Sequence, residues 1–250
     1  MDLVRKAKFS SVGDWFSHCI LVCSRNAAIV AATIATTTLT VTAGATFPAA
    51  AKEVAPTPER IMVFGDSLSA AYGLNPADGW VALMSTALKP RGVTVVNASI
   101  SGETTRGGLN RIQGDLARQK PSIVLIALGA NDGLRGLPVA DTQKNLEAIV
   151  TSVRAAKARP VLIGIQIPPN YGLDYTKSFS AVFPTLAKQY KLPLVPFLLD
   201  GIAEKLELFQ PDRLHPIAAA QPKILANVMP AVEEALKIKS AGVVTAAKRK

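Results

Sequence analysis

The sequence Ile-Met-Val-Phe-Gly-Asp-Ser-Leu-Ser at residues 61–69 runs from four apolar residues through a glycine into polar residues. Similar short runs of mainly aliphatic and β-branched residues recur along the chain, at 93–96, 123–128, 161–167 and 194–197. Runs of this length that lack strict apolar-polar alternation, bounded by glycine, proline or polar residues, are typical of strands buried on both faces. We therefore predict five buried strands.

Amphipathic stretches of helical length separate these runs, at 79–88, 105–119, 142–158 and 177–190, and a last one lies at 217–238. Strands that alternate with helices form a parallel sheet covered on both faces. The predicted fold class is therefore α/β, a three-layer α/β/α domain around a five-stranded parallel sheet. Ligands of such sheets bind at the carboxyl ends of the strands, so the residues that follow each strand are the candidates for a site.

The first 51 residues have the composition of an export signal. Residues 1–25 are basic and mixed, 26–45 carry no charge, and Pro-Ala-Ala-Ala follows at 48–51. This is the order of a secretory signal peptide, so we expect cleavage after Ala51 and a periplasmic or extracellular location. The alternative is an uncleaved anchor, since the uncharged stretch approaches the ~20 residues that span a bilayer.

Removal of this leader leaves a chain without cysteine and with a single histidine. Cys19, Cys23 and His18 all lie within it, so the mature chain has no disulfide, no thiol nucleophile, and His215 as its only imidazole. The remaining length suits one globular domain. We divide it into a linker at 52–59, a domain at 60–238 and a basic flexible tail at 239–250.

The formal net charge is +10, and part of the excess lies in the last residues, 237–250. No aromatic residue is interleaved with these charges, so nothing specific supports nucleic-acid binding, and we expect no nucleic-acid partner. A solubilising tail is the favoured interpretation. Attraction of anionic substrates or surfaces is the alternative.

Polar and glycine residues that follow the strands, with Asp212 and His215 at the opening of the last helix, supply every group needed for acyl transfer: a nucleophile, a base, a residue that orients the base, and oxyanion donors. Ser67, at a strand-to-helix turn near the positive end of a helix, is the candidate nucleophile. His215 is the candidate base, and Asp212 could fix its tautomer. The candidate oxyanion donors are the backbone amides of Ser67 and Gly102 and the side-chain amide of Asn131.

Each of these residues also has a structural interpretation. The segment 65–67 could be a turn with a capping side chain, and Asn-Asp-Gly at 131–133 is common in turns. Asp212 could cap the last helix or pair with Arg213, and His215 could be a solvated loop residue. The placement of all these residues at one edge of the sheet favours a functional site.

The sequence resembles the SGNH hydrolases, also called the GDSL family, whose letters correspond to Ser67, Gly102, Asn131 and His215. The blocks that carry the resemblance occur in the family's order: Gly-Asp-Ser-Leu at 65–68, Gly-x-Asn-Asp at 129–132 and Asp-x-x-His at 212–215. Within the family, the sequence is most similar to the exported bacterial thioesterase I, lysophospholipase L1 and arylesterase group.

The resemblance implies a flavodoxin-like hydrolase domain that needs neither a cofactor nor a metal. It implies hydrolysis of small acyl esters and thioesters, namely aryl esters, acyl-CoA and lysophospholipids, through an acyl-enzyme. We expect a monomer that could contact a lipid surface. By the same resemblance, the expected substrate-binding residues are Asp132, Gly133, Leu134, Pro169 and Tyr171, and the loop at 132–137 moves when an acyl chain binds.

Two positions depart from the group, which often has glycine where this chain has Ala130 and Arg213. Arg213 could pair with Asp212 or favour anionic substrates. Asp66 belongs to the motif without an obvious chemical step, and we expect it to hold the turn by hydrogen bonding.

Other functions fit the sequence less well. The α/β-hydrolase elbow requires Gly-x-Ser-x-Gly, and here Ser69 occupies the last position. A metal-dependent phosphoesterase relies on several histidines, and the mature chain has one. A carbohydrate O-deacetylase or a non-catalytic surface-binding domain on the same fold stays open.

Overall fold

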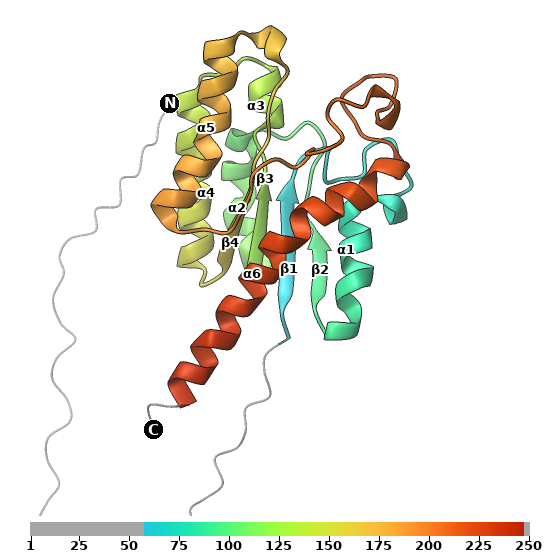
Figure 1. Cartoon of the computed structure of the whole chain (residues 1–250). Coiled ribbons are helices and arrows are strands. Elements are labelled where there is room, and N and C mark those ends of the chain that lie inside the picture. Colours follow the sequence, from blue (N-terminus) through green and yellow to red (C-terminus); the bar gives the residue numbers. More distant parts are fainter. Residues whose placement is uncertain (1–57, 248–250) are drawn as a thin grey trace, which may run out of the picture. The chain divides into compact units, whose positions relative to one another are not determined.

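The computed structural model describes residues 58–247, with side chains over 58–237. Its centre is a parallel sheet in the order β2-β1-β3-β4-β5, of which Figure 1 labels β1 to β4. The strands are β1 (Arg60–Gly65), β2 (Thr94–Asn97), β3 (Ile123–Ala127), β4 (Arg159–Ile163) and β5 (Leu194–Val195). The predicted α/β fold class with five parallel strands is confirmed.

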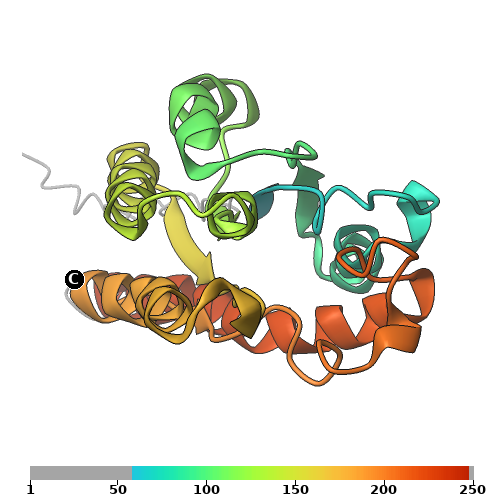
Figure 2. The ribbon, with the colours of Figure 1, turned by 90° about the horizontal axis from the view of Figure 1, so that it is seen from above.

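Helices cover both faces of this sheet. They are α1 (Trp80–Leu88), α2 (Thr105–Gln119), α3 (Ala130–Leu134), α4 (Val139–Ala155), α5 (Leu173–Tyr190) and α6 (Gln221–Ala247). Seen from above in Figure 2, α1 and α6 lie on one face, and α2 and α4 on the other. Helix α5 packs against α4 and against β4 and β5.

The core beneath the sheet's carboxyl edge holds the first loop in place. Trp80, the first residue of α1, is fully buried, and its indole N–H donates to the Leu68 carbonyl at 3.1 Å. Its backbone N–H donates to Oε1 of the buried Gln221, the first residue of α6, at 3.0 Å. The loop after β1 is therefore tied to helices from both ends of the domain.

Several elements differ from the sequence prediction in their bounds. The apolar run at 161–167 does not form one strand, because β4 ends at Ile163 and the buried Ile165 and Ile167 line a cavity instead. Helix α3 covers residues for which a turn was an alternative. Helix α5 begins at Leu173 rather than at residue 177.

The last helix is longer than predicted. Helix α6 does not end at residue 238 but continues to Ala247, so most of the expected flexible tail is helical. Its last turns contain no proline, the residue that most strongly ends a helix. The expected leader at 1–51, most of the linker and residues 248–250 lie outside the described residues.

Across residues 58–247, none of the helices has both the length and the apolar composition that a bilayer span requires.

Candidate active site

Ser67 follows β1 in a tight turn that Asp66 stabilises. The Asp66 carbonyl accepts from the amides of Ser69 and Ala70, and its carboxylate Oδ1 accepts from the Leu68 amide at 3.0 Å. Asp66 is 1% exposed. It therefore holds the turn by hydrogen bonding, as predicted.

Burial determines the charge behaviour of Asp66. Removal of its carboxylate from water raises the pKa to about 7, and the negative charges of Asp132 and Glu103 add to the effect. The motif thus contains a carboxyl that is easily protonated directly before Ser67.

A series of hydrogen bonds joins Ser67, His215 and Asp212. The Ser67 Oγ lies 2.8 Å from His215 Nε2, and His215 Nδ1 lies 2.6 Å from Asp212 Oδ2. The hydrogen bond with His215, followed by that from the Leu214 amide, lowers the pKa of Asp212 to about 2. An ionised Asp212 accepts from Nδ1–H, which leaves Nε2 free to accept the Ser67 hydroxyl proton.

The loop that carries Asp212 and His215 is closed by its own backbone. Phe209 and Pro216 form an antiparallel bridge, and the Gln210 amide donates to the His215 carbonyl at 2.8 Å. The side chain of Gln210 donates to the Tyr72 carbonyl at 2.8 Å, and the Tyr72 ring lies 4.5 Å from the His215 ring. The loop is therefore attached to the segment that follows Ser67.

Gly102 and Asn131 line the same cavity as Ser67. Gly102 follows β2 and has φ of 78°, a backbone conformation that favours glycine. The Asn131 side-chain amide, at the start of α3, donates to the Glu103 carbonyl at 3.0 Å. Arg135, just beyond α3, donates to the Gly102 carbonyl at 3.0 Å. Two bonds from the α3 region thus fix the loop after β2.

Sequence reasoning missed Arg111, which supports this loop from beneath. Its Nε donates to Glu103 at 2.7 Å, and its Nη1 donates to the Ala98 carbonyl at 2.9 Å and to Asp115 at 2.7 Å. The guanidinium also lies 4.0 Å above the Phe64 ring centre. The only sequence signal was the Arg111 to Asp115 spacing of four on a helix, which is common on solvent-exposed faces.

Asp132 and Gly133 are not among the residues that line the cavity, so their expected contact with substrate stays a prediction. Asp132 is 2% exposed and accepts hydrogen bonds from the Thr105 amide, at 2.8 Å, and from the Thr105 hydroxyl. A Cβ at Gly133 would lie 2.5 Å from Ile167. Close packing therefore excludes a side chain at Gly133, and Asp132 anchors α3 to α2.

Leu134 and Pro169 line the cavity, as their expected contact with substrate requires. Tyr171 does not, but its hydroxyl donates to the Leu134 carbonyl at 2.9 Å. Tyr171 therefore positions a lining residue instead of forming part of the wall.

The cavity has a volume of about 680 Å³ and contains Ser67, Gly102, Asn131 and His215 on its surface. Apolar side chains make up most of the remaining wall: Leu68, Ala130, Leu134, Ile165, Ile167, Pro168, Pro169, Phe197, Leu199 and Phe209. The contribution of residues 197–209 was not predicted. Within the described part of the chain, no group of three or more His, Cys, Asp or Glu side chains is placed to hold a metal ion.

Comparison with known proteins agrees with this geometry. The model of the GDSL-like lipase/acylhydrolase family matches residues 63–221. The chain belongs to this family. Membership of an acylhydrolase family, with relatives that are esterases and thioesterases, makes the chain a hydrolase of ester bonds that acts on small esters.

Individual members of the GDSL-like family cover most of the domain. The chain is 47% identical to "Esterase TesA" of Pseudomonas aeruginosa, over 71% of this chain and 90% of that protein. It is 41% identical to "Thioesterase 1/protease 1/lysophospholipase L1" of Escherichia coli K12, over 72% of this chain and 83% of that protein. Among solved structures, the chain is similar to the crystal structure of esterase EstA from Pseudoalteromonas, inhibited by monoethylphosphonate. The sequence identity is 42% and the TM-score 0.68, and the match covers 72% of this chain and 99% of that one.

Proposed function

We propose that Ser67 is the nucleophile of a hydrolase that cleaves carboxylic esters and thioesters through an acyl-enzyme. The observation that carries the proposal is the hydrogen-bonded series Ser67, His215 and Asp212, with Ser67 and His215 on the wall of a mainly apolar cavity. A serine, an imidazole and an ionised carboxylate in this order match the geometry of serine hydrolases on unrelated folds.

In the proposed reaction, Ser67 Oγ attacks the acyl carbon while its proton passes to His215 Nε2. The resulting oxyanion accepts from the backbone amides of Ser67 and Gly102 and from Asn131. One N–H of the Asn131 amide is fixed by the Glu103 carbonyl, so the second is available to the oxyanion.

Collapse of this intermediate expels the leaving alcohol or thiol, which takes the proton from His215. A water molecule then attacks the acyl-enzyme, giving its proton to His215, and the acid leaves as the proton returns to Ser67. Asp212 stays ionised throughout and orients the imidazole.

The apolar wall supports an acyl chain as the bound part of the substrate. It favours acyl chains over the sugar that a carbohydrate O-deacetylase would bind. Together with the names of the relatives, it supports esters, thioesters and lysophospholipids as substrates. We propose aryl esters and acyl-CoA among them. We also propose that residues 1–51 direct export to the periplasm or the medium, and that the mature chain is a monomer able to act at a lipid surface.

Substitution of the nucleophile tests the assignment. Ser67→Ala should abolish hydrolysis of p-nitrophenyl butyrate without changing the melting temperature. It should also prevent covalent labelling by an alkyl phosphonate ester, measured as a mass increase of the peptide that contains residue 67. Ser180→Ala, on α5 and away from the cavity, is the matched control and should behave as wild type.

Full activity of Ser67→Ala would exclude Ser67 as the nucleophile. Loss of wild-type activity with EDTA and recovery with Mn²⁺ would instead favour a metal-dependent reaction. Binding of an acyl ligand without turnover of any ester would favour a non-catalytic domain.

A further inference from the structure

Arg213 occupies a backbone conformation that side chains disfavour. Its φ is 58°, in the left-handed region, where a Cβ approaches the following carbonyl oxygen. Its amide donates to the Gln210 carbonyl at 2.8 Å, so the closed loop imposes this conformation. A residue other than glycine at such a position adjacent to an active site suggests that the side chain itself has a role.

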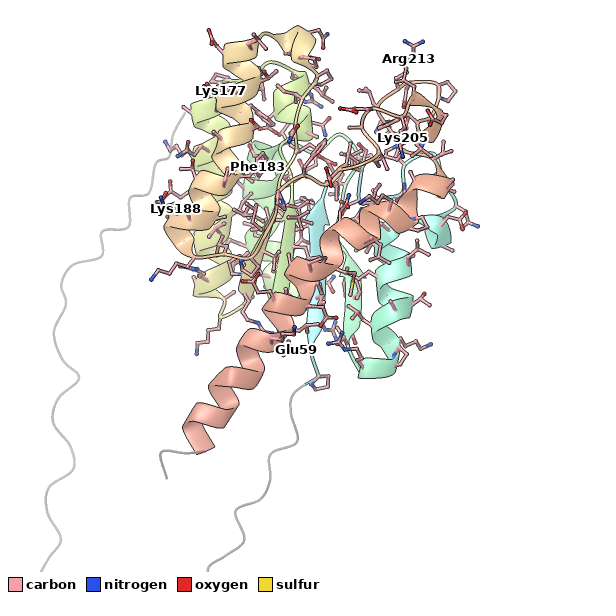
Figure 3. The ribbon with its side chains drawn as sticks, in the orientation of Figure 1. Glu59, Lys177, Phe183, Lys188, Lys205 and Arg213 are labelled. Atoms are coloured by element: carbon pink, nitrogen blue, oxygen red, sulfur yellow. The ribbon has the colours of Figure 1, made fainter. Side chains whose placement is uncertain are left out.

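The guanidinium of Arg213 is available to a ligand. Both carboxylate oxygens of Asp212 are already used, by the Leu214 and His215 amides and by the His215 ring. Among residues 58–237, Arg213 takes part in none of the ion pairs. Figure 3 shows it at the outer end of its loop, directed away from the core, and it is among the residues that line the cavity.

The proposed mechanism determines which part of the substrate passes Arg213. His215 protonates the leaving atom, so the leaving group departs on the His215 side of Ser67. Gly102 and Asn131, the proposed oxyanion donors, line the same cavity but come from the loop after β2 and from α3. Arg213 is two residues before His215 on the same closed loop and lines the cavity, which favours contact of its charge with the leaving group over contact with the acyl chain.

We propose that Arg213 binds a phosphate carried by the leaving group and thereby determines substrate preference. The inference rests on the ester and thioester hydrolysis proposed above. A guanidinium pairs with phosphate through two parallel hydrogen bonds, more selectively than an ammonium group does. Two classes of acyl ester carry phosphate on the leaving side, acyl-CoA and lysophospholipids, whereas aryl esters carry none.

Glu204 also lines the cavity, and its negative charge opposes a general positive field there. The preference therefore arises from direct contact between Arg213 and the phosphate, more than from long-range attraction. A contact of this kind lowers KM and changes kcat less.

Arg213→Gly is a suitable test because glycine fits the existing backbone and relieves its strain. Lys157→Gly is the matched control. Lys157 is exposed, has φ of 61°, and lies between α4 and β4, at the end of the sheet away from the site. Both variants lose one positive charge and place glycine in the left-handed region.

The substrates form two pairs that differ in phosphate but share the cleaved bond. Decanoyl-CoA is compared with S-decanoyl-N-acetylcysteamine, and decanoyl lysophosphatidylglycerol with monodecanoylglycerol. In Arg213→Gly, kcat/KM should fall about tenfold for a phosphate-bearing substrate, mainly through KM, as loss of a charge-assisted contact would cause. The phosphate-free partner should be unaffected, Lys157→Gly should resemble wild type, and Arg213→Lys should be intermediate.

The two pairs also distinguish the sources of phosphate. A fall for the lysophospholipid alone assigns Arg213 to a headgroup phosphate close to the cleaved bond, and a fall for decanoyl-CoA alone assigns it to a phosphate beyond the pantetheine arm. An equal change within both pairs would overturn the proposal. Absence of wild-type activity on all four substrates would instead contradict the proposed function.

Discussion

The two sides of Ser67 are built in different ways. On the base side, Asp212 accepts from residues two and three positions along the chain, and its side chain is 37% exposed. On the oxyanion side, Asn131 is tied to Glu103, and Asp132 to Thr105, across 28 and 27 positions. The Asp132 and Thr105 side chains are buried.

Because of this difference, substitutions on the two sides of Ser67 should differ in how they affect activity and the free energy of unfolding. Bonds within one short loop form wherever that loop forms, so a change there alters the reaction and leaves the rest of the fold intact. Bonds between distant segments exist only in the complete fold, so a change there should affect both the reaction and the free energy of unfolding.

Asp212→Asn should give the largest effect and confine it to activity. Asparagine retains an oxygen that can accept from the Leu214 and His215 amides, but it cannot stabilise the same histidine tautomer. We expect kcat for p-nitrophenyl butyrate to fall by about 10⁴, as in other serine hydrolases, with little change in melting temperature. A large drop in melting temperature would show that the contacts of Asp212 support the fold beyond their own loop.

Arg111→Gln should affect both properties, to a smaller degree. Misplacement of Glu103 would shift Asn131 and Gly102, so kcat should fall roughly tenfold to a hundredfold with KM unchanged. Loss of hydrogen bonds to two carboxylates should lower the free energy of unfolding by about 1 to 3 kcal/mol in urea titration.

Arg118→Gln provides the control for Arg111→Gln. Arg118 also pairs with Asp115 but is 66% exposed, so its loss should leave kcat and stability close to wild type. A fall in stability without a change in kcat for Arg111→Gln would show that Arg111 supports the fold and not the oxyanion site. Partial recovery of kcat in Arg111→Lys would support the positioning role.

Asp66→Asn should give the smallest effect, visible as a change in the pH dependence of stability. The pKa of Asp66 is about 7 in the folded chain, against 3.8 as the ordinary value, so the folded state holds a proton that the unfolded state has released. Stability contributed by this group is present below about pH 4 and is lost as the pH rises towards about 7.

The asparagine variant carries no such group, so its melting temperature should fall less than that of wild type between about pH 5 and about pH 8. An identical fall in both proteins would show that burial of Asp66 does not control this part of the stability curve.

The fold was predictable because its strands are encoded locally. Each apolar run contains one strand, although β2 at the edge of the sheet is not buried as predicted, and the parallel orientation follows from the helices between the strands. The bounds were less predictable where packing decides them. The run at 161–167 divides between β4 and the cavity wall, and only the three-dimensional position of Ile165 and Ile167 determines this division.

In the candidate site, too, contacts between residues close in sequence were predictable and contacts between distant segments were not. Asp212 and His215 are three positions apart, so their pairing could be predicted from the sequence. The burial of Asp132 and the contacts of Arg111 with Phe64 and Glu103 depend on segments that are distant in sequence. No local pattern distinguishes a buried anchor such as Asp132 from a residue that contacts substrate.

The Tyr72 ring against His215 gives the imidazole a magnetic signature of its own. The ring current of the tyrosine shifts the resonances of the imidazole protons away from those of a solvated histidine. The sequence contains only one other histidine, His18. One-dimensional proton NMR can therefore follow the ionisation of this one ring, and its contact with an inhibitor, without isotope labelling.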